Sequence, residues 1–250
     1  MLAGLTSVTF RSLGAEDIIK FAARNGLDCI EWGADIHARP DDTAAIDNIV
    51  KLSKQYGVQP ISYGSYYKAG CDNEFTAEQV VNAAARLGAK RIRVWAGFKS
   101  AADVSESEFD AMAADLSDFV RLAAEKGMTV ATEFHHHSYT EYARDALTLL
   151  RAVPGLRTYW QENPQISALG NYGEFKLLLP YTDTVHVFCF DADLKRYPLG
   201  DAEERWHEYI CAAKEEGRKD MPFLLEFVQN DSLEQAAEDA RALRKWLEEG

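Results

Sequence analysis

The chain has 250 residues, a hydrophobic fraction of 47% and a formal net charge of −13 at pH 7. This length suits one large domain or two small ones, and the apolar content is enough for a sizeable core. The acidic balance disfavours nucleic acid and anionic membrane surfaces as partners, because both repel a negatively charged protein.

The four cysteines are scattered, and their spacing matches neither a disulfide framework nor a Cys-x-x-Cys metal site. Reduced thiols are the simplest interpretation. The first ten residues lack the basic start and the long apolar core of a signal peptide. No apolar run reaches the roughly 18 residues that are needed to span a bilayer. We therefore expect a cytoplasmic protein without a membrane anchor.

One pattern recurs along the chain: a helix-forming segment ends at a glycine, and a short apolar run follows at once. The glycines of the four clearest copies are Gly26, Gly57, Gly88 and Gly127. Glycine ends a helix readily because it enters the left-handed region without a steric penalty. Helices that alternate with short strands are typical of βαβ units built around a parallel sheet.

In chain order, we expect strands near residues 6–10, 27–32, 58–63, 89–95, 128–133, 156–161, 184–190 and 223–228. We expect helices near residues 15–24, 43–55, 77–87, 106–125, 139–151, 171–179, 202–214 and 233–247. This alternation predicts a single (β/α)8 TIM barrel over residues 1–250, because such barrels have about 250 residues. An open doubly wound sheet is the alternative. It is disfavoured because no Gly-x-Gly-x-x-Gly follows the first strand.

Polar side chains stand at the ends of four successive predicted strands, where a barrel of this kind carries its chemistry. They are Glu133, Gln161, His186 and Glu226. Because side chains alternate along a strand, these groups can face the barrel axis while apolar neighbours such as Phe227 face the helices. The donor set suits Mn²⁺, Mg²⁺, Co²⁺ or Zn²⁺. Two carboxylates that flank a substrate also suit removal and return of a proton beside a carbonyl.

This order of strand ends, Glu then Gln then His then Glu, resembles that of the xylose isomerase-like TIM barrels of the AP endonuclease family 2 superfamily. That family contains sugar and sugar-phosphate isomerases and epimerases, with inosose dehydratases, hydroxypyruvate isomerases and endonuclease IV as relatives. The resemblance implies that Glu133 and Glu226 are catalytic and that they hold a metal together with His186 and Gln161. The sequence departs from the family at Gln161, where aspartate is usual, and at Pro164, where histidine is frequent. Both departures weaken the predicted metal site.

Five further side chains near the strand ends are candidates for substrate binding: His135, Glu31, Arg196, Trp95 and Tyr63. His135 has the facing to enter the site, and Arg196 resembles a family arginine that contacts substrate oxygens. Glu31 would either contact substrate or pair with an arginine. Trp95 and Tyr63 would either form a wall for a sugar face or fill the barrel mouth.

The leading hypothesis is a sugar or sugar-phosphate isomerase or epimerase that uses a divalent metal and a pair of glutamates. A keto-sugar or inosose dehydratase or lyase uses the same proton abstraction and stays open. A sugar-binding barrel without catalysis also stays open because of Gln161 and Pro164. A metal-dependent endonuclease is disfavoured by the net charge of −13 and by too few ligands for three zinc ions. The expected partner is a small carbohydrate. The particular sugar, its phosphorylation and a homo-oligomeric state are left open.

Overall fold

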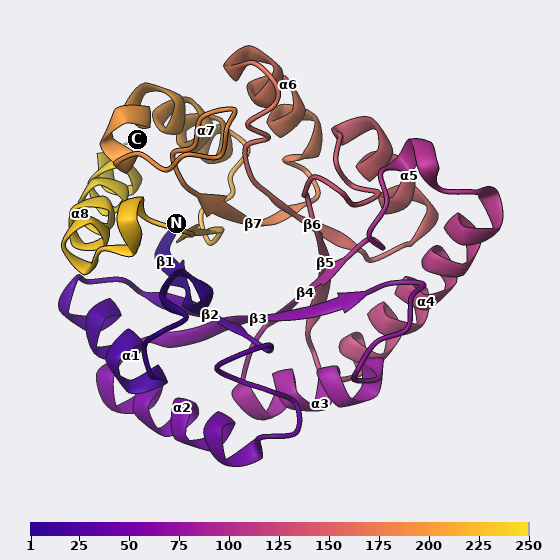
Figure 1. The fold of residues 1–250 in the computed structure, drawn as a ribbon, viewed down its shortest axis with the longest axis horizontal. Coiled ribbons are helices and arrows are strands. Elements are labelled where there is room, and N and C mark those ends of the chain that lie inside the picture. The colour runs from indigo at the N-terminus through magenta and orange to yellow at the C-terminus, as the bar shows by residue number, and fades with distance from the viewer. Residues whose placement is uncertain (250) are drawn as a thin grey trace.

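In the computed structural model, which describes residues 1–249, eight parallel strands close into a barrel and eight α-helices surround it (Figure 1). The strands pair in chain order, and β1 pairs with β8 to close the sheet. The predicted (β/α)8 TIM barrel is confirmed. Within the described residues, no helix combines the length and the apolar character that crossing a membrane requires.

The strands are β1 Leu2–Thr6, β2 Cys29–Gly33, β3 Gln59–Lys68, β4 Arg91–Trp95, β5 Thr129–Glu133, β6 Arg157–Trp160, β7 Thr182–Val187 and β8 Pro222–Leu225. The α-helices are α1 Ala15–Arg24, α2 Thr43–Tyr56, α3 Ala77–Leu87, α4 Glu106–Glu125, α5 Ala143–Ala152, α6 Ala168–Leu178, α7 Glu203–Glu215 and α8 Leu233–Glu249. Short 3-10 turns lie at η1 Ser7–Phe10, η2 Ala101–Asp103, η3 Leu199–Ala202 and η4 Gln229–Asp231.

The helix boundaries follow the capping residues. The bounds of α1, α3 and α4 match the prediction. Thr76 and Ser105 form reciprocal capping boxes at the starts of α3 and α4, and each satisfies backbone donors that have no partner within the helix. Gly88 ends α3 in the left-handed region, at φ 81°. Where the sequence has no such start signal the prediction is less accurate, since α5 begins four residues later than expected, at Ala143.

The first strand is displaced from its predicted position. The prediction placed it at residues 6–10, but β1 is Leu2–Thr6 and the next four residues form the turn η1. The apolar, β-branched run continues through both segments, so its composition does not show where the strand stops. Contacts with distant segments determine where the strand ends. Thr6 is the last residue of β1 to pair with β2, and the hydroxyl of Thr9 donates to the carbonyl oxygen of Leu225, at 3.3 Å.

The hydrophobic core between the sheet and the helices contains the aromatic side chains of β6 and its neighbours. Trp160, the last residue of β6, has no exposed surface. Its ring centroid lies 4.6 Å from that of Phe175 in α6 and 4.7 Å from that of Tyr209 in α7. Trp160 therefore faces the helices, as expected for the residue before Gln161.

Gly4 in β1 has no room for a side chain, and its replacement by alanine should be costly. A Cβ there would lie 2.5 Å from the carbonyl oxygen of Cys29 and 2.6 Å from Cδ2 of Leu224. We expect Gly4→Ala to lower the free energy of unfolding by about 1–3 kcal/mol, because the clash involves backbone. Gly173→Ala is the matched control. It meets no atom within 4 Å inside α6 and should raise stability by about 0.5–1 kcal/mol. Urea denaturation measures both, and equal effects would contradict the prediction.

Candidate functional site

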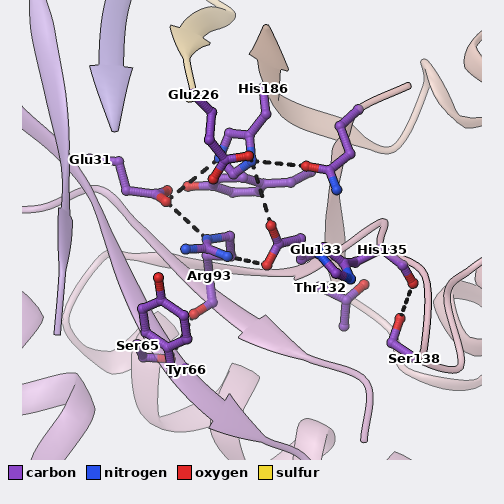
Figure 2. Close-up of polar contacts among 12 residues, drawn as sticks. Glu31, Ser65, Tyr66, Arg93, Thr132, Glu133, His135, Ser138, His186 and Glu226 are labelled. Carbon is purple, nitrogen blue, oxygen red and sulfur yellow. Dashed lines mark hydrogen bonds and ion pairs between the residues drawn. The ribbon is translucent and has the colours of Figure 1, made fainter. Parts of the chain in front are cut away.

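Three of the predicted side chains meet inside the barrel, at the carboxyl ends of their strands (Figure 2). Glu133 is the last residue of β5, His186 lies in β7, and Glu226 directly follows β8. One ligand atom from each lies within 4.8 Å of the other two. All three side chains are buried, with exposed fractions of 3%, 0% and 6%. They form the only group of this kind among residues 1–249.

The two ring nitrogens of His186 face different groups. Nδ1 lies 3.3 Å from Oε2 of Glu226, 3.6 Å from Oε1 of Glu133 and 3.2 Å from Oε1 of Gln161. Nε2 faces the other way, 3.6 Å from Oε1 of Glu31, and makes no hydrogen bond. Nδ1 therefore faces three side-chain oxygens, those of Glu133, Gln161 and Glu226.

This arrangement fits a divalent cation. A histidine that binds a metal through one ring nitrogen usually presents the other to a carboxylate, and Glu31 occupies that place. Glu31, Glu133 and Glu226 contribute −3 and the buried guanidinium of Arg93 contributes +1, which leaves −2 when His186 is neutral. A divalent ion would balance this charge. Gln161 supplies a neutral oxygen where aspartate was expected, so the cluster has one carboxylate fewer than the resemblance implied.

Arg93 is a member of the site that the sequence reading missed. It lies on β4 with 3% of its side chain exposed, and its Nε donates to Oε1 of Glu31 at 2.9 Å. Its Nη1 donates to Oε2 of Glu133. Figure 2 shows the guanidinium between these two carboxylates, and it also lies over the ring of Tyr66, 5.3 Å from the ring centroid. Gly64 makes the space, because a Cβ there would lie 2.7 Å from Nη2 of Arg93.

These contacts set the ionisation of the cluster. Burial, the largest single influence, would raise the pKa of Glu133 and of Glu31, but the Arg93 guanidinium and His186 together outweigh it and hold both pKa values below the ordinary value. Burial would lower the pKa of His186, yet the carboxylates around it, Glu226 foremost, hold this pKa well above its ordinary value. Glu133 and Glu31 are therefore held as carboxylates, and a cation at Nδ1 would compete with a proton for that nitrogen.

A cavity of about 230 Å³ opens beside the cluster, and Gln161 and Glu226 line it. Much of the remaining wall is aromatic, including Phe188 and Phe190, whose rings stack with centroids 4.3 Å apart. The other lining residues are Phe134, His135, His136, Glu141, Glu162, Asn163, Pro164, Leu194, Arg196 and Phe227. The cavity thus combines polar and apolar lining residues, as ligand sites commonly do.

Phe227 departs from the expected alternation. Its side chain lines the cavity instead of facing the helices. The reason is its backbone, which lies in the left-handed region at φ 56° and reverses the direction in which the side chain would point. The amide of Phe227 donates to the hydroxyl of Thr9 at 3.2 Å, which anchors this turn directly after Glu226.

Two substrate-binding candidates line the cavity and a third supports it. His135 lines the wall and packs against Trp95, with ring centroids 4.6 Å apart. Trp95 is not among the lining residues, so it supports His135 from behind. Arg196 lines the cavity with its guanidinium 4.8 Å from the ring centroid of Phe227, and Asp231 forms an ion pair with it.

The other two candidates do not reach the cavity. Tyr63 is fully buried in the core, and its hydroxyl donates to the carbonyl oxygen of Ala38 at 2.6 Å. Its neighbour Ser62 faces the barrel interior, where it donates to Glu31, so alternation turns Tyr63 towards the helices. Of the two roles expected for Tyr63, the structure shows the space-filling one, because the ring packs in the core and does not line the cavity. Of the two roles expected for Glu31, the structure shows the ion pair with an arginine.

The chain belongs to a family whose model matches most of its length. The geometry defines a (β/α)8 barrel with a carboxylate and imidazole cluster at the carboxyl ends of its strands. The family model that matches residues 19–249 is the xylose isomerase-like TIM barrel, and the chain is a member of that family. Among curated protein sequences, none matches this chain.

Several solved structures share the fold at low sequence identity. A probable 3-DHS dehydratase, AsbF, from Bacillus anthracis has a TM-score of 0.83 and 20% identity, with 98% of this chain and 99% of that chain covered. A D-tagatose 3-epimerase-like protein has a TM-score of 0.79 and 16% identity, with 99% of this chain and 97% of that chain covered. The IOLI protein with a bound zinc atom has a TM-score of 0.75 and 14% identity, with 99% and 98% covered. At these identities the comparison concerns the fold alone.

Proposed function

We propose that this protein is a metal-dependent isomerase or epimerase of a small sugar or sugar phosphate, with Glu133 and Glu226 as its proton-transferring pair. The observation that carries the proposal is the convergence of Glu133, His186 and Glu226, whose ligand atoms lie within 4.8 Å of one another beside a cavity. Two ionisable carboxylates and an imidazole at the mouth of this fold are the groups that such a reaction needs.

The reaction follows from the placement of the two glutamates. One carboxylate takes the proton from the carbon beside the carbonyl, and the electrons of the broken C–H bond form an enediolate. The other glutamate, which is protonated when substrate binds, returns its proton to carbon and regenerates the carbonyl, so that the two side chains exchange protonation states. Arg93 keeps Glu133 ionised between turnovers. Gln161 and His186 would complete the ligand set of a cation. When bound, that cation supplies positive charge near the oxygen that becomes negative.

The size of the cavity supports a single small substrate. Its volume of about 230 Å³ lies near the lower end of the range for small-molecule pockets. One monosaccharide is of this order, whereas an oligosaccharide is not. The relatives described above include an epimerase-like protein and a protein that binds zinc, which agrees with this class of substrate and cofactor.

A dehydratase or lyase acting on a keto-sugar or a related ring is the second candidate. It begins with the same proton abstraction, but a hydroxyl group then leaves with a proton as water and a carbon–carbon double bond forms. The aromatic wall at Phe188, Phe190 and Phe227 favours it, because this wall offers no partners for hydroxyl groups. The likeness to a probable 3-DHS dehydratase also supports it.

Deuterium incorporation separates these candidates. We expect the protein loaded with Mn²⁺ and incubated in D₂O with a panel of ketoses and ketose phosphates to place deuterium beside the carbonyl of one of them. An isomerase or epimerase yields a product of otherwise unchanged formula, whereas a dehydratase yields a product that is lighter by one water. Chelation with EDTA should abolish both reactions. Absence of deuterium exchange across the panel, together with retained sugar binding, would contradict catalysis and support a binding barrel.

A further inference from the structure

We infer that Arg93 is a positioning residue with a second role, that of a built-in cation which limits how tightly the cluster holds a divalent metal. This inference rests on the metal site of the proposed function. It concerns Arg93 itself, which is not among the site residues that the resemblance implies.

The first step is that the protein is built to hold this guanidinium. Arg93 is 3% exposed, and its two donors reach different carboxylates, Glu31 through Nε and Glu133 through Nη1. Any side chain at position 64 would intrude, since a Cβ on Gly64 would lie 2.7 Å from Nη2 of Arg93 and 3.0 Å from Oε1 of Glu31. The ring of Tyr66 lies against the guanidinium. The backbone of Tyr66 has a φ of 57°, a conformation that bulky residues rarely adopt.

The second step concerns orientation. Arg93 engages Oε2 of Glu133, and the remaining oxygen, Oε1, is the one that lies 3.6 Å from Nδ1 of His186. In the same way, Oε1 of Glu31 lies 2.9 Å from Arg93 and 3.6 Å from Nε2 of His186. One guanidinium thus fixes both Glu133 and Glu31, the carboxylate that faces Nε2 of the histidine. Because a buried charge without its partner is costly, neither carboxylate turns away freely.

The third step concerns charge. The carboxylates of Glu31, Glu133 and Glu226 and the guanidinium of Arg93 sum to −2 with a neutral histidine, and Gln161 adds nothing. Without Arg93 the same cluster would carry −3. A positive charge fixed among the ligands repels a second cation, and the repulsion is strong where water is excluded. Metal affinity is therefore set by the balance between Arg93 and Glu31 as well as by the ligands themselves.

A series of variants that change the charge of the cluster tests this inference. Their Mn²⁺ affinity is measured by calorimetry on the metal-free protein without substrate. Relative to wild type at −2, Glu31→Gln leaves −1 and should bind Mn²⁺ roughly tenfold more weakly. Arg93→Gln leaves −3 and should bind roughly tenfold more tightly. The double variant, Glu31→Gln with Arg93→Gln, returns to −2 and should return close to wild-type affinity. A merely structural role of Arg93 would not produce this reversal.

Arg91→Gln is the matched control, because Arg91 lies on the same strand and pairs with Asp183 instead of the cluster. It should leave Mn²⁺ affinity unchanged. If Arg93→Gln does not fold, Glu31→Gln and the double variant still test the inference. Only the charge balance predicts that the double variant binds Mn²⁺ more tightly than Glu31→Gln. Unchanged or weaker binding by a folded Arg93→Gln variant would overturn the inference. Failure of every ketose to react would overturn the proposed reaction only.

Two further outcomes keep the two proposals apart. If wild type binds no Mn²⁺ while Arg93→Gln does, Arg93 is confirmed as the competing cation and the metal dependence of the proposed function fails. If neither protein binds Mn²⁺, the inference about Arg93 is overturned as well.

Discussion

Replacing Glu226 with glutamine should lower kcat by roughly a hundred- to ten-thousandfold while the protein stays folded. The change keeps the shape of the side chain and an oxygen that could still face a bound cation, but it removes the carboxylate that the proposed proton transfer requires. In the structure Oε2 of Glu226 lies 3.3 Å from Nδ1 of His186 and the side chain lines the cavity. Steady-state kinetics on the Mn²⁺-saturated protein, with the melting temperature from circular dichroism, measure both parts of the prediction.

Glu238→Gln is the control for this variant. Glu238 is exposed on α8, so its replacement makes the same change of charge away from the cavity. It should leave both kcat and the melting temperature unchanged. A Glu226→Gln protein that turns over at the wild-type rate would remove Glu226 from the mechanism and leave Glu133 without its partner.

Replacing Trp160 with alanine should lower the free energy of unfolding by about 3–5 kcal/mol. Trp160 has no exposed surface and packs on Phe175 and Tyr209 between β6 and two helices. Truncation leaves a cavity between β6 and the helices, and the rings of Phe175 and Tyr209 are too closely packed to move into it. Urea denaturation measures the loss, and Leu169→Ala on α6 is the control, because Leu169 is 81% exposed. A loss below about 1 kcal/mol would mean that the layer collapses around the missing ring.

Much of the fold and part of the site were predictable because strand ends and helix caps are local signals. Glu133, His186 and Glu226 each stand as a polar group in or directly after an apolar strand, and alternation alone turned them towards the axis. Gln161 was recognised in the same way, since it follows the fully buried Trp160. The glycine-terminated helices marked four of the βα units, and the helical and apolar segments between and after them completed the count of eight that predicts the barrel.

The rest depends on contacts between distant segments. Arg93 sits two residues from Arg91 in β4, and both read equally well as surface charges. The strand alternation shows only that they share a face, whereas the partners of Arg93, Glu31 and Glu133, lie 62 and 40 residues away. The position of Phe227 depends on a left-handed backbone held by Thr9, which no strand pattern contains. The contribution of Phe227 to the aromatic wall was missed for that reason.

The pairing of β1 with β8 has a consequence for the order in which the site can form. Glu31 and Arg93 are made early in synthesis, but Glu226 follows a strand that pairs with Ala3, Leu5 and their neighbours at the opposite end of the chain. Thr9 also links the two ends of the chain, because its hydroxyl donates to the carbonyl oxygen of Leu225 and accepts from the amide of Phe227. Contacts this distant in sequence are slow to form in a folding chain. The cluster of Glu133, His186 and Glu226 is therefore incomplete until the last strand closes onto the first.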